Sequence, residues 1–323
     1  ITEYCAKYPE IYAEWAANEK GALEVCAGAS MAGARSICCM KHVGLNVASD
    51  PLYTLAYTGV NGGLVVVVAD DPGMHSSQNE QDSRMHARGS QVPMLEPSDS
   101  DECRAFTKLA FELSEKYDTP VFVRTTTRVA HARSVVHPQE RVEAALKPYQ
   151  KDISKWVMMP GMAKGRHVVV EKRMNDLAKD ASSLPVNRVE MGDTKIGVIC
   201  SGMAYQYVKE VAPEISVLKL GIVNPLPMDL IADFARQVET LYVFEELEPV
   251  IEEQVAAHGI PVTGKALTGR QGELSAHKVA KLLGKEIPTA AQPDPVPARP
   301  PVLCPGCPHR GVYAVLNKLK CTV

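Results

Sequence analysis

Glu19 is the first candidate for chemistry, because this single carboxylate stands at the start of a run of very small residues. Between positions 21 and 33, residues without bulk recur at three- and four-residue spacing, which predicts a helix with one bare face. Each glycine in a helix costs about 1 kcal/mol against alanine, so close approach of a backbone or a ligand should offset that cost. A carboxyl at the mouth of such a helix can hold or pass a proton. The alternative is a packed core helix whose first-turn Glu is solvated and favoured by the helix dipole.

A polar loop after a valine-rich segment is the second candidate. Residues 64–69 are apolar and β-branched, as in a buried strand, and residues 70–82 then carry Asp70, Asp71 and His75 among Ser, Asn, Gln and Glu. Loops of this kind are often functional, because the scaffold fixes them and leaves them accessible. His75 is a candidate proton carrier and the two aspartates are candidate substrate ligands. A solvated surface loop is the alternative.

Cysteine spacing gives the third candidate. Cys304 and Cys307 form a Cys-x-x-Cys hairpin, which presents two thiolates to one metal ion or cluster. Two thiolates are half of the ligands that a metal or cluster site needs, and Cys321 is a poor candidate for a third. The alternative is a turn that contains an unligated cysteine pair. The chain has nine cysteines and no visible signal peptide, which favours reduced thiols in a cytoplasmic protein.

Composition sets the broad class. A chain of 323 residues with 46% hydrophobic and 23% charged residues can form two globular domains. A net charge of −3 gives no support to binding of nucleic acid or of an anionic membrane. No apolar run approaches the roughly 20 residues that span a bilayer.

Strand and helix patterns alternate along residues 10–140. This predicts an α/β fold with a parallel sheet covered on both faces, and ligands of such sheets bind at the carboxyl ends of the strands. The loops at 41–47, 70–92 and 126–133 should therefore cluster. The expected strands are Ser36–Met40, Leu64–Ala69, Pro93–Glu96 and Pro120–Thr125, and the expected helices are Lys20–Arg35, Pro51–Gly59 and Asp101–Tyr117, the last capped by residues 98–100.

The rest of the chain predicts a connector, a second α/β segment and a linker. The connector covers residues 141–165, and the second segment runs from about 166 to 288, with helices at 166–183, 203–211, 228–238 and 249–258 and strands at 195–200, 215–219 and 240–244. Residues 285–302 are rich in proline, as in a semi-rigid linker. The expected division is a domain at 1–150, a smaller domain at 151–286, a linker at 287–302 and a new domain starting at 303–323. Glu245, Glu246 and Glu248 predict an acidic helix cap with a domain-contact role, with a metal site as the alternative.

Three separated motifs carry a resemblance to a known family. Residues 14–35 with Glu19, residues 41–47, and residues 70–82 occur in this order and resemble the alpha subunit of indolepyruvate:ferredoxin oxidoreductases. This is a branch of the thiamine diphosphate-dependent 2-oxoacid:ferredoxin oxidoreductases. The resemblance implies a pyrimidine-type thiamine diphosphate-binding domain followed by a smaller transketolase C-terminal-like α/β domain. Residues 303–323 would begin the diphosphate-binding domain.

The same resemblance implies roles for individual residues. Glu19 would hydrogen-bond the aminopyrimidine ring of the cofactor, and Gly44 would lie beside the cofactor. Lys41 and His42 would be cationic partners of a 2-oxoacid carboxylate. Asp70 stands where the pyruvate branch carries a substrate-binding arginine, which fits the indolepyruvate branch and puts carboxylate recognition by Asp70 in doubt.

The expected activity is oxidative decarboxylation of arylpyruvates such as indolepyruvate to acyl-CoA, with electrons passed to ferredoxin. Thiamine diphosphate, Mg²⁺ and [4Fe-4S] clusters would be cofactors, coenzyme A the co-substrate, and a beta subunit and ferredoxin the partners in a hetero-oligomer. A non-oxidative thiamine diphosphate-dependent 2-oxoacid decarboxylase and a non-catalytic iron–sulfur electron-transfer scaffold are the alternatives. The first residue, Ile1, and the fresh motif close to Val323 suggest a piece of a longer polypeptide.

Overall fold

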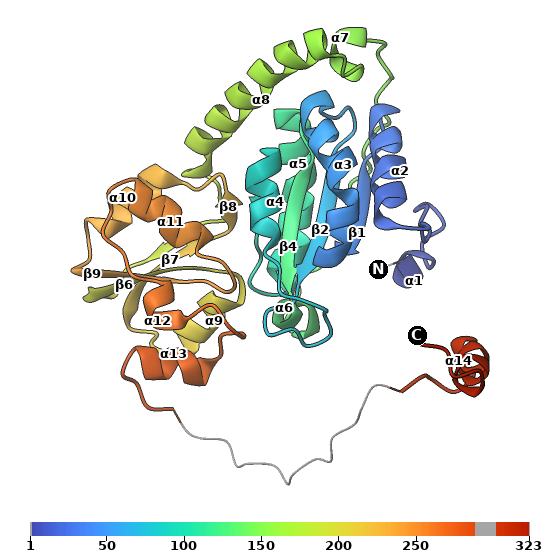
Figure 1. Ribbon diagram of the computed structural model, residues 1–323. Coiled ribbons are helices and arrows are strands. Elements are labelled where there is room, and N and C mark those ends of the chain that lie inside the picture. The colour runs from blue at the N-terminus through green and yellow to red at the C-terminus, as the bar shows by residue number, and fades with distance from the viewer. Residues whose placement is uncertain (1, 288–301, 323) are drawn as a thin grey trace. The chain divides into compact units, whose positions relative to one another are not determined.

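Parallel strands rich in β-branched residues form the first sheet, as expected (Figure 1). The strand order is β1-β2-β4-β3-β8. The first four strands run parallel and β8 pairs antiparallel with β3. The bounds are β1 Ser36–Lys41, β2 Leu64–Asp70, β3 Met94–Leu95, β4 Val121–Thr126 and β8 Ile222–Asn224. Strand β8 comes from the second alternating segment, so the first sheet draws on both segments of the chain.

A second sheet of four strands has the order β5-β7-β6-β9. Strands β7, β6 and β9 are parallel and β5 is antiparallel to β7. The bounds are β5 Arg188–Glu190, β6 Asp193–Ser201, β7 Ile215–Leu220 and β9 Thr240–Phe244. The expected strands at 195–200, 215–219 and 240–244 are therefore confirmed, and the short β5 and β8 were missed.

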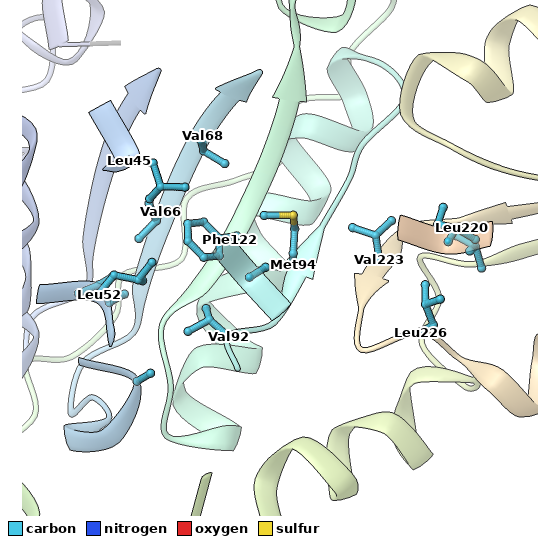
Figure 2. Packing of buried hydrophobic residues seen from close by; sticks show 14 of the residues in the cluster. Leu45, Leu52, Val66, Val68, Val92, Met94, Phe122, Leu220, Val223 and Leu226 are labelled. Atoms are coloured by element: carbon cyan, nitrogen blue, oxygen red, sulfur yellow. The ribbon is translucent and has the colours of Figure 1, made fainter. Parts of the chain in front are cut away.

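Buried side chains connect the two sheets through one core (Figure 2). Leu45 and Val66 of the first sheet's layer belong to the same cluster as Phe122, Val223 and Leu226, the last two from the second segment. A separate cluster on the other side of the first sheet joins helix α5, Ser100–Tyr117, to helix α8, Pro160–Ala181. Helix α8 begins before the expected position 166 and packs on the first sheet.

The computed structural model describes residues 2–287 and 302–322, and the chain divides after Glu286 into two compact units. Most of the expected linker, at 288–301, lies outside the described residues. The second unit contains helix α14, His309–Lys318. In the parts described, no helix is both long enough and apolar enough to cross a membrane. The remaining helices of the first unit are α1 Thr2–Cys5, α7 Ile153–Trp156, α9 Gly202–Val211, α10 Met228–Ala235, α11 Val250–Ala257, α12 Lys265–Thr268 and α13 Ala276–Leu282.

The expectation of a loop at 41–47 is wrong. Helix α3 runs from His42 to Thr58 and contains Pro51, where the sequence suggested a helix start. Gly44 and Pro51 are weak helix formers, but Leu45 is fully buried. Burial of this face therefore outweighs local propensity.

Two further segments expected as loops contain helices. Helix α4 covers Ser83–Ser90 within the expected loop 70–92, and α6 covers Thr127–His131 within the expected loop 126–133. The sequence of α4 is short and polar, so its periodicity gave no signal. The Asp82 side chain caps α4 by accepting from Arg84 N at 3.0 Å.

The small-residue helix is confirmed as α2, Glu19–Met31, but its bare face is shorter than expected. Gly33 lies beyond the helix at φ +100°, and a Cβ there would be 1.8 Å from the carbonyl oxygen of Lys147. Gly28 has no atom within 4 Å of such a Cβ. Gly33 therefore ends the helix against this chain's own backbone, whereas Gly28 lies on an exposed face of the helix.

Candidate active site at the carboxyl edge of the first sheet

Glu19 lies in the first turn of α2, where Asn18 caps the helix by accepting from Gly21 N at 2.9 Å. Its side chain packs directly on Gly44 of α3. A Cβ at position 44 would be 2.4 Å from Glu19 Cγ and 2.6 Å from Oε1. Among the described residues, the half-buried Glu19 carboxylate has no hydrogen bond or ion pair. It is a placed carboxylate with free acceptor capacity.

The first turn of α3 connects Glu19 to the loop after β2. Beside Gly44, the buried His42 directs Nδ1 to Ala69 O and Nε2 to Asn79 O, both at 3.3 Å. The predicted substrate ligand His42 therefore lies between two backbone carbonyls, where it holds the loop against α3. Since a neutral imidazole can donate from only one nitrogen, it donates to one of the two.

Lys41 precedes α3 and reaches the same loop. Its Nζ donates to Ser76 O at 2.8 Å and lies 3.8 Å from Asp71 Oδ2, and its side chain is 36% exposed. An ammonium has three donors. Lys41 therefore anchors the loop and keeps donor capacity toward solvent.

Asp71 organises the loop by accepting four hydrogen bonds. The donors are Thr127 Oγ1 at 2.7 Å, Ser76 N at 2.9 Å, His75 N at 3.2 Å and the Ser77 hydroxyl. Burial opposes ionisation of this carboxyl, but the hydrogen bonds outweigh it and hold the pKa of Asp71 well below its usual range. Asp71 thus shapes the turn that presents His75.

Asp70 points the other way, into the interior. It accepts from Arg124 Nε at 2.7 Å and from Ser83 N and Oγ at 3.0 Å, and it is 1% exposed. Burial raises the pKa of Asp70, Arg124 lowers it, and the neighbouring Asp82 raises it further. The predicted substrate ligand Asp70 therefore has protein partners. Arg124 was not predicted, although a lone arginine in an otherwise uncharged strand was a signal for it.

Arg84 holds the two sheets together. It donates to Asp82 Oδ2 and to Glu245 Oε2, each at 2.6 Å, and to the carbonyls of Glu246 and Glu248 at 2.7 and 2.9 Å. Glu245 also accepts from the backbone at the start of α11. The expected acidic cap with a domain-contact role is confirmed for Glu245, and no local sequence signal pointed to Arg84.

The second unit contains the cysteine pair. Cys307 N donates to Cys304 O at 3.0 Å, and Cys307 Sγ lies 3.4 Å from His309 Nδ1. Within the described residues, no group of three or more His, Cys, Asp or Glu side chains could hold a metal ion. The pair alone provides two thiols, and a cluster would need further ligands.

The structure thus brings Glu19, Gly44, Lys41, His42 and the 71–77 loop together around the start of α3, with Asp70 buried beneath. His75 Nε2 lies 3.2 Å from Glu273 Oε2 of the second segment. Among the described residues, the half-buried Glu19 carboxylate has no partner and lies against the bare backbone of Gly44. Such a carboxylate can accept a hydrogen bond from a ligand or exchange a proton with it.

Comparison with known proteins identifies similar chains. The family described as pyruvate flavodoxin/ferredoxin oxidoreductase, thiamine diphosphate-binding, matches residues 3–183. Proteins named indolepyruvate oxidoreductase subunit IorA are similar over nearly the whole chain. The identity is 41% for Pyrococcus horikoshii and 42% for Methanothermobacter thermautotrophicus, each over 97% of this chain and 53% and 54% of the relative, respectively. For Archaeoglobus fulgidus it is 36%, over 96% of this chain and 53% of the relative. The chain spans about half the length of these curated relatives.

Two solved structures share the fold. One is a 2-oxoglutarate:ferredoxin oxidoreductase from Magnetococcus marinus with 2-oxoglutarate, coenzyme A and succinyl-CoA bound, at a TM-score of 0.68 and 16% identity, over 87% of this chain and 58% of that one. The other is a split-gene transketolase in an inactive β4 tetramer, at a TM-score of 0.59 and 15% identity, over 87% and 85%. The predicted α/β thiamine diphosphate-binding fold is confirmed.

Proposed function

This chain belongs to the pyruvate flavodoxin/ferredoxin oxidoreductase family of thiamine diphosphate-binding domains, and on that basis we propose that it forms the pyrimidine-binding part of a catalytic subunit that oxidises arylpyruvates such as indolepyruvate. The observation that carries the proposal is the Glu19 carboxylate seated on Gly44 with no protein partner among the described residues. The names of the relatives support the arylpyruvate substrate.

Glu19 and Gly44 fit the pyrimidine half of the cofactor. When bound, thiamine diphosphate supplies the carbon nucleophile for attack on the 2-oxo carbon. Glu19 holds a proton at a pyrimidine ring nitrogen, and Gly44 lets the carboxylate lie against the α3 backbone because it has no side chain. Leu23 of α2 and Leu45 of α3 are fully buried. They exclude water from the inner side of these helices.

Residues on the loop side provide for the substrate. Lys41 retains exposed donor capacity for the 2-oxoacid carboxylate, while His42 fixes the loop from below. His75 carries a proton at the loop turn, which Asp71 holds in place. Asp70 supports the loop from the interior through Arg124.

The intact enzyme would contain further groups. We propose Mg²⁺ with the cofactor, coenzyme A as co-substrate, [4Fe-4S] clusters as electron carriers, and a beta subunit and ferredoxin as partners. Cys304 and Cys307 would provide thiolates to one cluster, which is half of its usual cysteine set. A cytoplasmic hetero-oligomer is the expected form.

Replacement of Glu19 by Gln in the full-length enzyme tests the proposal. Hydrogen–deuterium exchange at the thiazolium carbon and arylpyruvate-dependent ferredoxin reduction should both fall by about 10²–10⁴-fold, the range of a positioned acid–base group. Glu24→Gln is the matched control, since Glu24 is an exposed carboxylate on the same helix, and it should leave both rates unchanged. Near-normal exchange in Glu19→Gln would remove Glu19 from the mechanism.

The same assays separate the alternatives. A non-oxidative decarboxylase would release an aldehyde without reducing ferredoxin. A scaffold that only transfers electrons would reduce ferredoxin from a chemical donor, without Glu19-dependent exchange. Either result would contradict the proposed reaction.

A further inference from the structure

His75 has a specific partner from a distant part of the chain. Its Nε2 lies 3.2 Å from Glu273 Oε2, and Glu273 lies between α12 and α13, in the segment that carries the second sheet. The His75 side chain is 39% exposed and that of Glu273 is 22% exposed. The contact therefore joins a partly open imidazole to a more sheltered carboxylate.

The turn around His75 packs against the segment that holds Glu273. Gly73 has φ +84°, and a Cβ placed there would lie 3.5 Å from both Glu273 N and His75 Nε2. Asp71 fixes the other side of the turn by accepting from His75 N at 3.2 Å. The His75 ring is thus positioned by its own loop and by Glu273.

Arg128 in turn fixes Glu273. Its Nε donates to Glu273 Oε2 at 2.6 Å, and its Nη2 donates to Oε1, so the guanidinium binds both carboxylate oxygens. The Arg128 hydrogen bond is the largest of the causes that hold the pKa of Glu273 below its usual range, and the His75 contact acts in the same direction. Glu273 is therefore a carboxylate and an acceptor at neutral pH.

We infer that Glu273 is a positioning residue that sets the tautomer of His75. Its carboxylate accepts a hydrogen bond from Nε2–H, so that the neutral imidazole carries its proton on Nε2 and its lone pair on Nδ1. This follows from the 3.2 Å contact, because a carboxylate can only accept and Nε2 must then donate. The inference rests on the proposed function, in which His75 carries a proton. It also gives the second α/β segment a role in the chemistry of the first sheet.

Other charged groups near this pair come from several elements. Lys41 and Asp71 lie on the α3 and loop side, and Glu80 accepts from Gly73 N at 2.5 Å. Tyr207 of α9 and Glu246 after β9 add to the field around Arg128 and Glu273. Within the described part of the chain, Glu273 is the one carboxylate at ion-pair distance from the His75 ring.

Imidazole ¹⁵N spectra of the full-length enzyme test the inference directly. The His75 signals are assigned from a His75→Gln sample. The wild-type spectrum should show the Nε2-protonated tautomer at high pH, and Glu273→Gln should lose this preference because its amide can donate as well as accept. Arg128→Lys, which keeps the charge but not the two-pronged contact, should weaken the preference less.

Kinetics provide the second measurement. Glu273→Gln should lower kcat about 10- to 100-fold, by analogy with the range for partners that orient metal-bound histidines, with KM little changed. Glu273→Asp should restore part of kcat. Arg270→Gln is the matched control, because Arg270 lies in the same loop as Glu273 and makes an exposed ion pair with Glu248. It should change neither kcat nor KM.

The outcomes separate the inference from the proposed function. An unchanged His75 tautomer in Glu273→Gln would overturn the inference whatever the activity. Full activity of His75→Gln would remove His75 from the reaction, and the positioning role of Glu273 in catalysis would be overturned with it. Loss of the tautomer preference together with a lower kcat at an unchanged KM supports the inference.

Discussion

Two kinds of carboxylate lie at the carboxyl edge of the first sheet, and their surroundings are opposite. Glu19 touches bare backbone at Gly44 and has no hydrogen bond or ion pair among the described residues. Asp82 is buried and accepts from Arg84 Nε at 2.9 and 3.1 Å, on its two oxygens, and from Nη2 at 2.6 Å. The second carboxylate is fully committed to the protein and the first is not.

The difference follows from the energetics of burial. A fully desolvated charge is tolerated only with close partners of opposite charge. The buried ion pairs that Arg84 and Arg124 form with their carboxylate partners are therefore suited to stabilising the fold. A half-buried carboxylate can remain without a protein partner because water still reaches it, and a ligand can then displace that water. The comparison shows why the free carboxylate of Glu19, and not the buried charge cluster, is the one we propose as the reactive group.

Among the variants that test this comparison, removal of Arg84 should have the largest effect on stability. Arg84→Met leaves Asp82 and Glu245 buried without their shared cation, and we expect a loss of about 3–5 kcal/mol in the free energy of unfolding. Urea unfolding of the chain measures this. The control Arg270→Gln affects an exposed ion pair and should cost less than about 1 kcal/mol. A similarly small loss for Arg84→Met would show that the buried cluster does not hold the sheets.

Gly44→Ala tests the other carboxylate of the comparison, Glu19. The new Cβ would be 2.4 Å from Glu19 Cγ, and the flexible Glu19 side chain would move away while the fold adapts. A displacement near 1 Å at a reacting centre can cost about 10²-fold in rate, so kcat of the intact enzyme should fall by about that factor. The melting temperature should change little. A variant with normal kcat would show that the position of Glu19 on Gly44 is not important.

Asp71→Asn tests the carboxylate that lies between these extremes. The variant keeps the size and one acceptor oxygen but loses the charge, and a hydrogen bond to a charged group contributes roughly 1 kcal/mol more than one to a neutral group. We expect a total loss of about 1–3 kcal/mol at pH 7. Because folding depresses the pKa of Asp71, this stabilisation is fully present above the unfolded pKa of about 3.9 and disappears as the pH falls further. Urea unfolding at pH 7, 5 and 4 should give a nearly constant difference from wild type down to about pH 5. A difference that grows toward low pH would contradict the assignment.

Local patterns predicted most of the first sheet and the Glu19 position. Runs of valine define β2, and Glu19 precedes a helix of small residues that the structure confirms as α2. Both depend on spacing within about a dozen residues, which a sequence displays directly. Helix α3 was only partly predicted, because Gly44 and Pro51 hide a helix that burial of Leu45 stabilises.

Long-range partners could not be predicted. The pairing of Arg84 with Glu245 and that of His75 with Glu273 join segments far apart in the sequence. No periodicity encodes such pairs, since they depend on how the two sheets share a core. The predicted substrate ligand Asp70 illustrates the limit: its motif was visible, but its orientation toward Arg124 was not.

The smallest expected effect concerns Gly28, on the exposed face of α2. A Cβ at this position meets no atom within 4 Å, and replacing a helical glycine by alanine gains about 0.5–1 kcal/mol. Gly28→Ala should therefore raise the free energy of unfolding of the chain by that amount, measured with urea. Gly28→Leu should also be tolerated by the isolated chain, because the space is open. In the intact enzyme we expect Gly28→Leu to lower turnover, since a thiamine diphosphate site needs a second domain close to this helix and a leucine would hold the backbones apart. Full turnover of Gly28→Leu in the intact enzyme would show that the bare face of α2 is solvent-exposed and that only Glu19, at its end, approaches the cofactor.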